Sequence, residues 1–188
     1  MSDAEVMGSQ FHAVLVEIDR ELAAKARAHG CPYCGGKLHS AQYPRKPRGW
    51  PGAEVGGEMR LSYCCESCRR RTTPASVRFL GRRVYSAAVM VLGSALPGRL
   101  SVAAARTLCG ALKVPKRTLE RWRRWWRQSF VTTPQWILGG ASFMPPIGPQ
   151  ELPGGLLERF QGDDWGTRLS RCLRFLTTVP VPVCGHLP

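Results

Sequence analysis

The chain has 188 residues, of which 44% are hydrophobic, so it is long enough for one ordinary domain or two small ones with a packed core. Its formal net charge is +14, and 22 of its 27 basic residues are arginines. The excess is confined to residues 36–128, where twenty basic side chains accompany four acidic ones. Such a charge, set among patterned apolar segments, favours an anionic macromolecule as partner and argues against a basic tail that only keeps the protein in solution.

The N-terminal ten residues are polar and acidic, unlike a secretory signal peptide. The longest apolar run, residues 84–96, is shorter than the roughly 20 residues that cross a bilayer. We therefore expect a cytoplasmic protein without a membrane partner, and the basic excess adds the expectation that it is nucleoid-associated. In that reducing compartment, the eight cysteines favour metal ligation over a disulfide framework.

Residues 1–30 are predicted to contain an amphipathic helix over 9–29. Its apolar residues recur at helical spacing and share one face: Phe11, Val14, Leu15, Ile18 and Leu22. Ser9 is the expected N-cap, and Gly30 is expected to end the helix. The opposite face is expected to be solvated; it carries Glu17, Asp19 and Glu21.

Four cysteines form the most specific motif, with Cys31 and Cys34 in one Cys-x-x-Cys turn and Cys65 and Cys68 in another. Each turn places two thiolates on one side of a tight loop, and two such turns make a closed tetrahedral site. The sequence therefore predicts a zinc ribbon over residues 31–80 that binds one Zn²⁺ through these four cysteines. Because a closed site has no open position, the zinc is expected to be structural and not catalytic.

Two other side chains are alternative ligands. Cys64 adjoins Cys65 and competes with it, although only Cys65 has the two-residue spacing to Cys68. His39 is the second alternative, although a lone histidine in a strand-like segment is more often a surface residue.

Short strands are predicted over 37–42 and 59–63. Between them, residues 43–52 contain three prolines, which favour an extended loop. Three basic residues of this loop are predicted to contact DNA along the backbone or in the minor groove: Arg45, Lys46 and Arg48. Tyr43 and Trp50 have two interpretations, since they could stack on bases or cover the ribbon as its small core. A further basic stretch is expected to meet phosphates: Arg69, Arg70, Arg71, Arg78, Arg82 and Arg83.

Residues 81–130 are predicted to be helical, with helices over 84–95, 102–112 and 115–130. Their buried residues are expected to include Val102, Ala105, Leu108, Leu112, Leu119 and Trp122. The pattern of residues 101–122 is typical of a helix-turn-helix, in which Ser101 caps the first helix, Val114 fills the turn and Pro115 begins the second helix. Four side chains then lie on the face that enters the major groove: Lys116, Arg117, Thr118 and Arg121. Three later arginines are expected to meet phosphates: Arg123, Arg124 and Arg127. The alternative is an ordinary pair of basic amphipathic helices.

Residues 131–188 are predicted to comprise a proline-rich linker over 131–155, a helix over 156–175 interrupted near Gly162, and a disordered tail. The apolar residues of that helix favour two arrangements equally, a seam between two copies of the chain or packing against its own domain. The sequence offers few carboxylates here and no strand pattern, so we expect no enzymatic activity.

The order of these motifs resembles the short zinc-ribbon and helix-turn-helix DNA-binding proteins of bacterial insertion sequences, and the N-terminal DNA-binding part of related transposases. The resemblance covers roughly residues 31–128 and implies that Cys31, Cys34, Cys65 and Cys68 bind the metal and that the helix over 115–127 reads DNA. The long loop between the knuckles and the C-terminal extension depart from the family pattern, and the transposase catalytic domain has no counterpart.

Together these observations predict an α+β, mainly α, fold in which a Cys₄ zinc ribbon precedes a helix-turn-helix unit, with helices on either side. The predicted function is zinc-dependent, sequence-specific binding of double-stranded DNA, as a transcriptional regulator or as an accessory to a transposase or recombinase. A homodimer would suit a palindromic site. An RNA-binding or protein-bridging ribbon module is the alternative.

Overall fold

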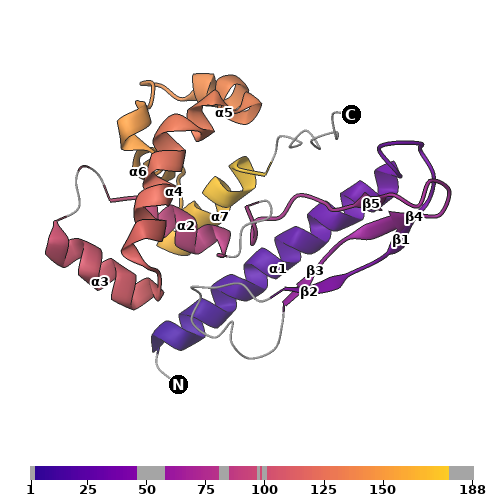
Figure 1. The fold of residues 1–188 in the computed structure, drawn as a ribbon, viewed down its shortest axis with the longest axis horizontal. Helices are drawn as coiled ribbons and strands as arrows, with labels where there is room; N and C mark the ends of the chain where they lie inside the picture. Colours follow the sequence, from indigo (N-terminus) through magenta and orange to yellow (C-terminus); the bar gives the residue numbers. More distant parts are fainter. Residues whose placement is uncertain (1–2, 46–57, 81–84, 97, 99–100, 178–188) are drawn as a thin grey trace.

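The computed structural model describes residues 3–45, 58–80, 85–96, 98 and 101–177. Within them the chain is mainly helical with short antiparallel strands, which confirms the predicted α+β, mainly helical, class (Figure 1). The helices are α1 (Asp3–His29), α2 (Ala87–Ser94), α3 (Val102–Leu112), α4 (Lys116–Gln128), α5 (Pro134–Gly139), α6 (Gly154–Glu158) and α7 (Trp165–Phe175). The strands are β1 (Leu38–Ser40), β2 (Tyr43–Arg45), β3 (Glu58–Arg60), β4 (Tyr63–Cys65) and β5 (Arg71–Thr72), and single 3₁₀ turns are η1 (Phe130–Thr132), η2 (Gly140–Ser142) and η3 (Pro149–Glu151).

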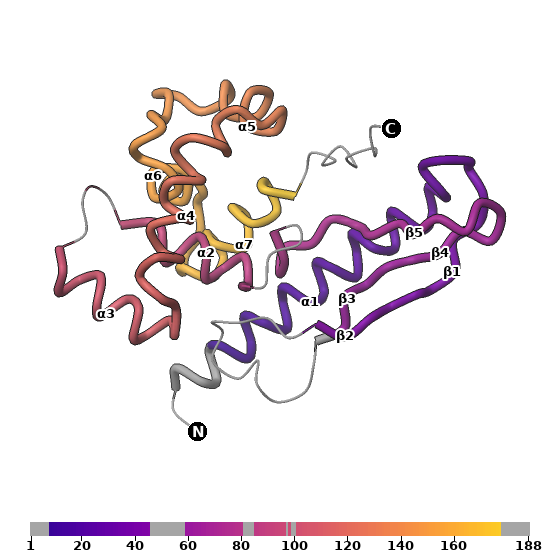
Figure 2. The backbone as a smooth tube through the Cα atoms, in the orientation of Figure 1, coloured from indigo at the N-terminus to yellow at the C-terminus, as the bar shows by residue number. Residues whose placement is uncertain are grey.

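Helix α1 has 27 residues and is therefore about 40 Å long. It starts well before Ser9, so the predicted N-cap at Ser9 was wrong, but it ends at His29 as predicted. Gly30 follows with a φ of 78°, a left-handed conformation that ends a helix. The strands lie beside the C-terminal half of α1, whereas α2 to α7 gather near its N-terminal half (Figure 2).

The buried face of α1 contacts both parts of the chain. Phe11, Leu15 and Ile18 belong to the core formed with the later helices, whereas Ala23 belongs to a small core beneath the strands. Val14, predicted on the buried face, is half exposed. The contact with the later helices is made by Phe11, Leu15 and Ile18. One continuous helix therefore connects the two cores.

Asp19 is almost fully buried, so its predicted solvated position was wrong. Its carboxylate accepts hydrogen bonds from the Val77 N–H at 2.7 Å, the Ser76 hydroxyl at 2.6 Å and the Arg78 Nε at 2.8 Å. Arg78 also donates to the Met59 carbonyl. Arg78 is accordingly a buried structural residue and not the phosphate contact that its place in a basic stretch suggested.

The strands form two small antiparallel sheets, one in the order β1-β4-β5 and one that pairs β2 with β3. In the larger sheet Leu38 lies opposite Cys65, and Ser40 lies opposite Tyr63. Because side chains alternate across a strand, Leu38, Tyr63 and Cys65 all point inward, where they are buried. The Tyr63 hydroxyl donates to the Ala23 carbonyl at 3.0 Å, which fixes this sheet against α1.

Helices α2, α3 and α4 contact one another pairwise. Helix α2 is shorter at its N-terminus than predicted, because Ser86 caps it by accepting from the Val89 N–H. Ser101 caps α3 as predicted, whereas Pro115 is the N-cap of α4 and not part of its first turn. Lys113 is left-handed, with a φ of 49°, and ends α3. Val114 is buried in the connection, as predicted.

Val102 was predicted to be buried but is 70% exposed, because α3 packs through its other residues: Ala105 is buried, and Leu108 and Leu112 are partly buried against a hydrophobic core. Leu119 and Trp122 of α4 are buried as predicted. Gly93 of α2 allows the close approach of these helices, since a Cβ there would lie 2.9 Å from Leu112 Cδ1.

The stretch 131–155 is not the predicted proline-rich linker. It contains α5 and three 3₁₀ turns, and α6 begins at its end. The prolines do not prevent these elements, because Pro134 and Pro149 each stand at the first position of one, where the missing N–H costs nothing. The interruption predicted near Gly162 is confirmed, since α6 and α7 are separate helices.

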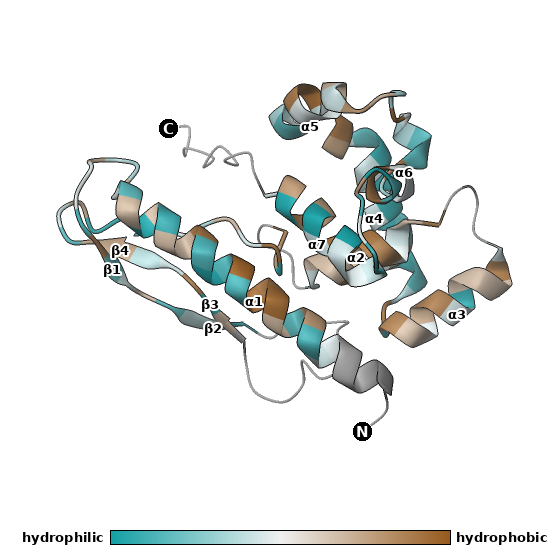
Figure 3. Ribbon diagram, turned by 180° about the vertical axis from the view of Figure 1, so that it is seen from behind, coloured by the Kyte–Doolittle hydropathy of each residue, from teal (hydrophilic) through white to brown (hydrophobic). Residues whose placement is uncertain are grey.

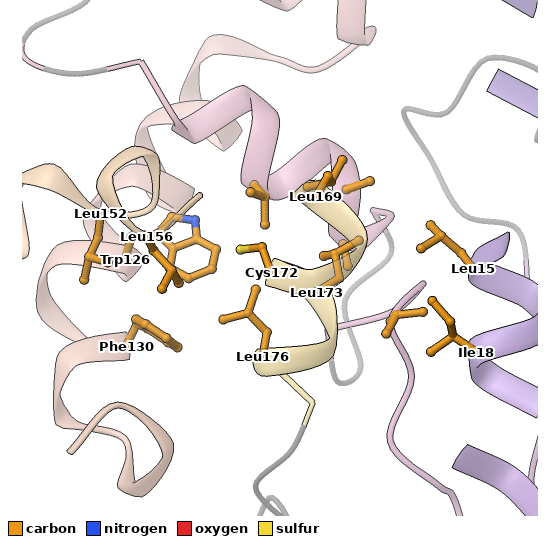
Figure 4. Close-up of a cluster of buried hydrophobic side chains, with 14 of the residues drawn as sticks. Leu15, Ile18, Trp126, Phe130, Leu152, Leu156, Leu169, Cys172, Leu173 and Leu176 are labelled. Carbon is orange, nitrogen blue, oxygen red and sulfur yellow. The ribbon is translucent and has the colours of Figure 1, made fainter. Parts of the chain in front are cut away.

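Helix α7 lies between α1 and the α4–α6 side of the helical body (Figure 4). Leu169, Cys172 and Leu173 are fully buried there against residues such as Trp126 and Ile18. Of the two predicted arrangements for this apolar face, the structure therefore has the packing within one chain. None of the helices in the described ranges combines the length and the apolar composition that a bilayer crossing requires.

Candidate metal centre and basic helix

The two Cys-x-x-Cys turns have the same backbone geometry. In the first, the Cys31 N–H donates to the Gly36 carbonyl and the Gly35 N–H donates to the Cys31 carbonyl. In the second, Cys65 makes the same two bonds with Arg70 and Arg69. Gly35 and Arg69, which follow the second cysteine of each turn, are both left-handed, with φ of 71° and 59°. The chain thus forms two equivalent knuckles from different sequences.

The two knuckles face each other and bring four sulfurs together. The Sγ atoms of Cys31, Cys34, Cys65 and Cys68 all lie within 4.8 Å of one another. The Cys31 and Cys68 sulfurs are 3.6 Å apart, and those of Cys34 and Cys65 are 3.5 Å apart. Four soft donors this close could hold one metal ion, and the structure places all four predicted ligands in the same cluster.

Backbone N–H groups point at the sulfurs. Donation from the Cys68 N–H, together with bonds from Ser67 and Cys34, lowers the pKa of the Cys65 thiol to about 6. The Arg70 N–H likewise favours the Cys68 thiolate, but burial and the neighbouring sulfurs outweigh it and raise the pKa of Cys68 to about 12. The thiolate form is therefore favoured at Cys65 by backbone donors and disfavoured at Cys68 by burial and by the neighbouring sulfurs.

Both alternative ligands lie outside the cluster. Cys64 lies on the opposite face of β4 from Cys65, and its thiol donates to the Arg69 carbonyl at 3.5 Å. His39 Nε2 lies 2.9 Å from a carboxylate oxygen of Glu66 on the exposed face of the same sheet. The alternation of side chains across β4 therefore selects Cys65, which the two-residue spacing had favoured.

Gly36 follows the first Cys-x-x-Cys turn, where glycine suits the bend of the backbone, and the structure adds a second reason for glycine there. A Cβ at Gly36 would lie 3.0 Å from Cys65 Sγ and 2.7 Å from the Ser67 Oγ. The first knuckle therefore approaches the second closely at this point, and any side chain larger than hydrogen would separate the two pairs of sulfurs.

Helix α4 has two distinct faces. Leu119, Trp122 and Trp126 are buried. Arg117, Arg121 and Arg124 recur at positions i, i+4 and i+7 on the other face, and all three are exposed. We call these three residues the arginine row. None of them forms a hydrogen bond or an ion pair with the described residues, so their donors face solvent.

The other residues of α4 that were predicted to contact DNA are less exposed or have partners within the chain. Lys116 is exposed but lies 3.8 Å from the Glu120 carboxylate, and Thr118 is half-buried. Arg127 is half-buried, with Nη2 3.5 Å from the Gly98 carbonyl. Arg123 is buried and donates to the carbonyls of Leu96 and Gly98, so its prediction as a phosphate contact was wrong.

Several basic residues around the strands stack on aromatic rings of the same chain. The Arg45 guanidinium stacks on the Phe79 ring at 5.0 Å. Arg71 stacks on Tyr43 at 5.4 Å, and Arg70 stacks on Tyr33 at 4.8 Å. Several predicted contacts lie outside the described residues, namely Lys46, Arg48, Trp50, Arg82 and Arg83.

Comparisons with protein-family models, with curated proteins and with solved structures found no match to this chain.

Proposed function

We propose that this chain is a zinc-dependent, sequence-specific DNA-binding protein, in which a zinc ribbon supports a helix-turn-helix that reads duplex DNA. The observation that carries the proposal is the arginine row: three exposed guanidinium groups on one face of a helix whose other face is buried. Arginine is the residue that most often recognises guanine in the major groove, and a helix fits that groove.

The α3–α4 connection supports this assignment. A left-handed Lys113, a buried Val114 and an N-capping Pro115 join two helices in three residues, which is the short connection expected of a helix-turn-helix. The arginine row begins in the first turn of α4, and in this motif the N-terminal residues of the second helix contact base edges. Its positive charge has no anionic partner among the described residues, so an anionic ligand is the natural complement.

Zinc is the metal that suits the cysteine cluster best. Tetrahedral Zn–S bonds of about 2.3 Å place sulfurs about 3.8 Å apart, close to the 3.5 and 3.6 Å separations across the two knuckles. Cys31, Cys34, Cys65 and Cys68 would hold it, and the backbone N–H groups on Cys65 and Cys68 would orient the thiolates. The ion would supply a structural cross-link, since four thiolates leave no position for a substrate.

Selection of bound sequences from a random duplex pool, with an RNA pool run alongside, tests the proposal. Enrichment of one duplex sequence is the expected result. Enrichment from the RNA pool alone would replace it with an RNA-binding function, and enrichment from neither would favour a protein-bridging module. Whether the protein regulates transcription or assists a transposase, as its resemblance to insertion-sequence proteins suggests, then follows from where the selected site lies.

Replacing one residue of the arginine row should weaken binding to the selected site. We expect Arg121→Ala to cost about 1–3 kcal/mol of binding free energy, because a bidentate contact to a guanine edge is lost. Fluorescence anisotropy with the selected and a scrambled duplex measures the loss. Arg20→Ala on α1 is the matched control, since it removes the same charge from an exposed arginine that pairs with Glu17. Equal losses on both duplexes would show that Arg121 meets only phosphates.

A further inference from the structure

Glu120 on α4 is the only acidic residue of the sequence between Glu66 and Glu151. The same stretch carries fifteen lysines and arginines, so its net charge is strongly positive. A carboxylate within such a stretch weakens the attraction for phosphates. A protein that bound nucleic acid through charge alone would gain nothing from it, so we looked for a specific role.

Glu120 shares the exposed face of α4 with the arginine row. It lies three residues after Arg117 and four before Arg124, and residues at these spacings are neighbours on a helix surface. The Glu120 side chain is 58% exposed. Teal segments of α4 in Figure 3 mark the hydrophilic residues of this helix. A ligand that contacts the arginine row therefore also meets the Glu120 carboxylate.

The ion pair of Glu120 does not account for its presence. Its one ion-pair partner among the described residues is Lys116, whose Nζ lies 3.8 Å from the carboxylate. Both side chains are more than half exposed, and exposed pairs of this kind contribute little to stability. The order along the helix, with lysine before glutamate, is also the less favourable one.

The base edges of the major groove differ in whether they offer a carboxylate a donor. Guanine presents two acceptors, N7 and O6, and thymine presents the O4 acceptor. Adenine has the N6 amine, but its N7 acceptor lies beside it and faces the same ligand. Cytosine presents the N4 amine without an acceptor, so a carboxylate in the groove is satisfied best by cytosine.

We propose that Glu120 is a specificity-determining residue that accepts a hydrogen bond from the N4 amine of a cytosine in the bound site. The inference rests on the proposed function, because it requires α4 to lie in the major groove. Where the facing base offers no donor, the carboxylate loses its water without replacement and repels the acceptor opposite it. Glu120 therefore selects against duplexes that the arginine row would otherwise bind through charge alone.

Repeating the duplex selection with two variants of the full-length, metal-loaded chain tests this role. The wild-type protein should require cytosine at one position of its site. Glu120→Ala should lose the preference at that position alone, and Glu120→Gln should change it to adenine, because glutamine pairs with adenine N6 and N7. Circular dichroism should show that both variants keep the wild-type fold.

Fluorescence anisotropy gives the size of the effect. For Glu120→Ala, the ratio of the dissociation constants for the scrambled and the selected duplex should fall at least about fivefold. Part of that fall should come from tighter binding of the scrambled duplex, since a negative charge is removed from the contact face.

Glu17→Gln on α1 is the matched control, because it removes the same charge from a carboxylate of similar exposure that also pairs with a basic residue of its own helix. It should leave the selected sequence and the ratio unchanged. An equal fall in Glu17→Gln would overturn the inference, since net charge alone would then be the cause. Wild-type selection and discrimination in both Glu120 variants would overturn it as well.

These outcomes are distinct from failure of the proposed function. A wild-type chain that enriches no duplex would overturn the proposed function, and the role of Glu120 in the groove with it. A wild-type chain that enriches a duplex without a required cytosine would overturn only the role of Glu120.

Discussion

Cys65→Ser should abolish stoichiometric zinc binding and unfold the strands. The Cys65 sulfur is fully buried, receives two backbone N–H bonds and lies 3.5 Å from Cys34 Sγ, so a hydroxyl cannot replace it as a soft ligand. Structural zinc contributes on the order of 10 kcal/mol to small modules of this kind. The core beneath the strands is small, so it cannot hold them without the metal. Elemental analysis should fall from one zinc per chain to about zero, and hydrogen exchange should show loss of protection over residues 31–45 and 58–72.

Cys64→Ser is the control for this experiment, because Cys64 is the adjacent cysteine and lies on the other face of β4. It should retain one zinc per chain and the same exchange protection. The reverse pattern, with zinc lost in Cys64→Ser and kept in Cys65→Ser, would mean that the strand register around the cluster is wrong. Retention of fold and DNA affinity after complete chelation would contradict the supporting role of the metal.

Asp19→Ala should lower the free energy of unfolding of the metal-loaded protein by about 3–5 kcal/mol. The substitution leaves the buried Arg78 guanidinium without its counter-ion, and it leaves the Val77 N–H and the Ser76 hydroxyl without an acceptor. Each unsatisfied buried group adds its own desolvation cost. Urea denaturation followed by tryptophan fluorescence and circular dichroism measures the change.

Glu17→Ala tests whether burial is the cause. Glu17 lies on the same helix and pairs with Arg20 at 3.0 Å, but both side chains are about two-thirds exposed. Its loss should change the free energy of unfolding by no more than about 0.5 kcal/mol. A second test removes both charges: Arg78→Met in an Asp19→Leu background should recover part of the loss, because no unpaired charge remains. Equal effects at Asp19 and Glu17 would contradict the account.

The cysteine cluster could be predicted closely, because ligand spacing is a local property of the sequence. Two residues between cysteines suffice to place two thiolates in one turn, and the alternation within β4 then separates Cys65 from Cys64. The same holds for α3 and α4, since Ser101 and Pro115 act on their own helix ends.

The sequence did not reveal which charged side chains are buried. Asp19, Arg78 and Arg123 are of residue types that usually lie on the surface. They are buried here because partners distant in the chain supply their hydrogen bonds. The prolines between residues 134 and 153 led to the wrong prediction of a linker for a related reason. Proline forbids a helix interior but suits a helix start, and only the surrounding packing decides between a loop and a succession of short helices.

Helix α1 has a further consequence for how ligands act on this protein. Its N-terminal half belongs to the core shared with α4 and α7, and only Gly30 separates its last residue, His29, from Cys31. A helix that is part of both cores makes them a single cooperative unit, so neither can unfold without cost to the other. On the proposed function, metal binding beside the strands and duplex binding at α4 would then be thermodynamically linked, and each ligand would raise the affinity for the other by the same factor.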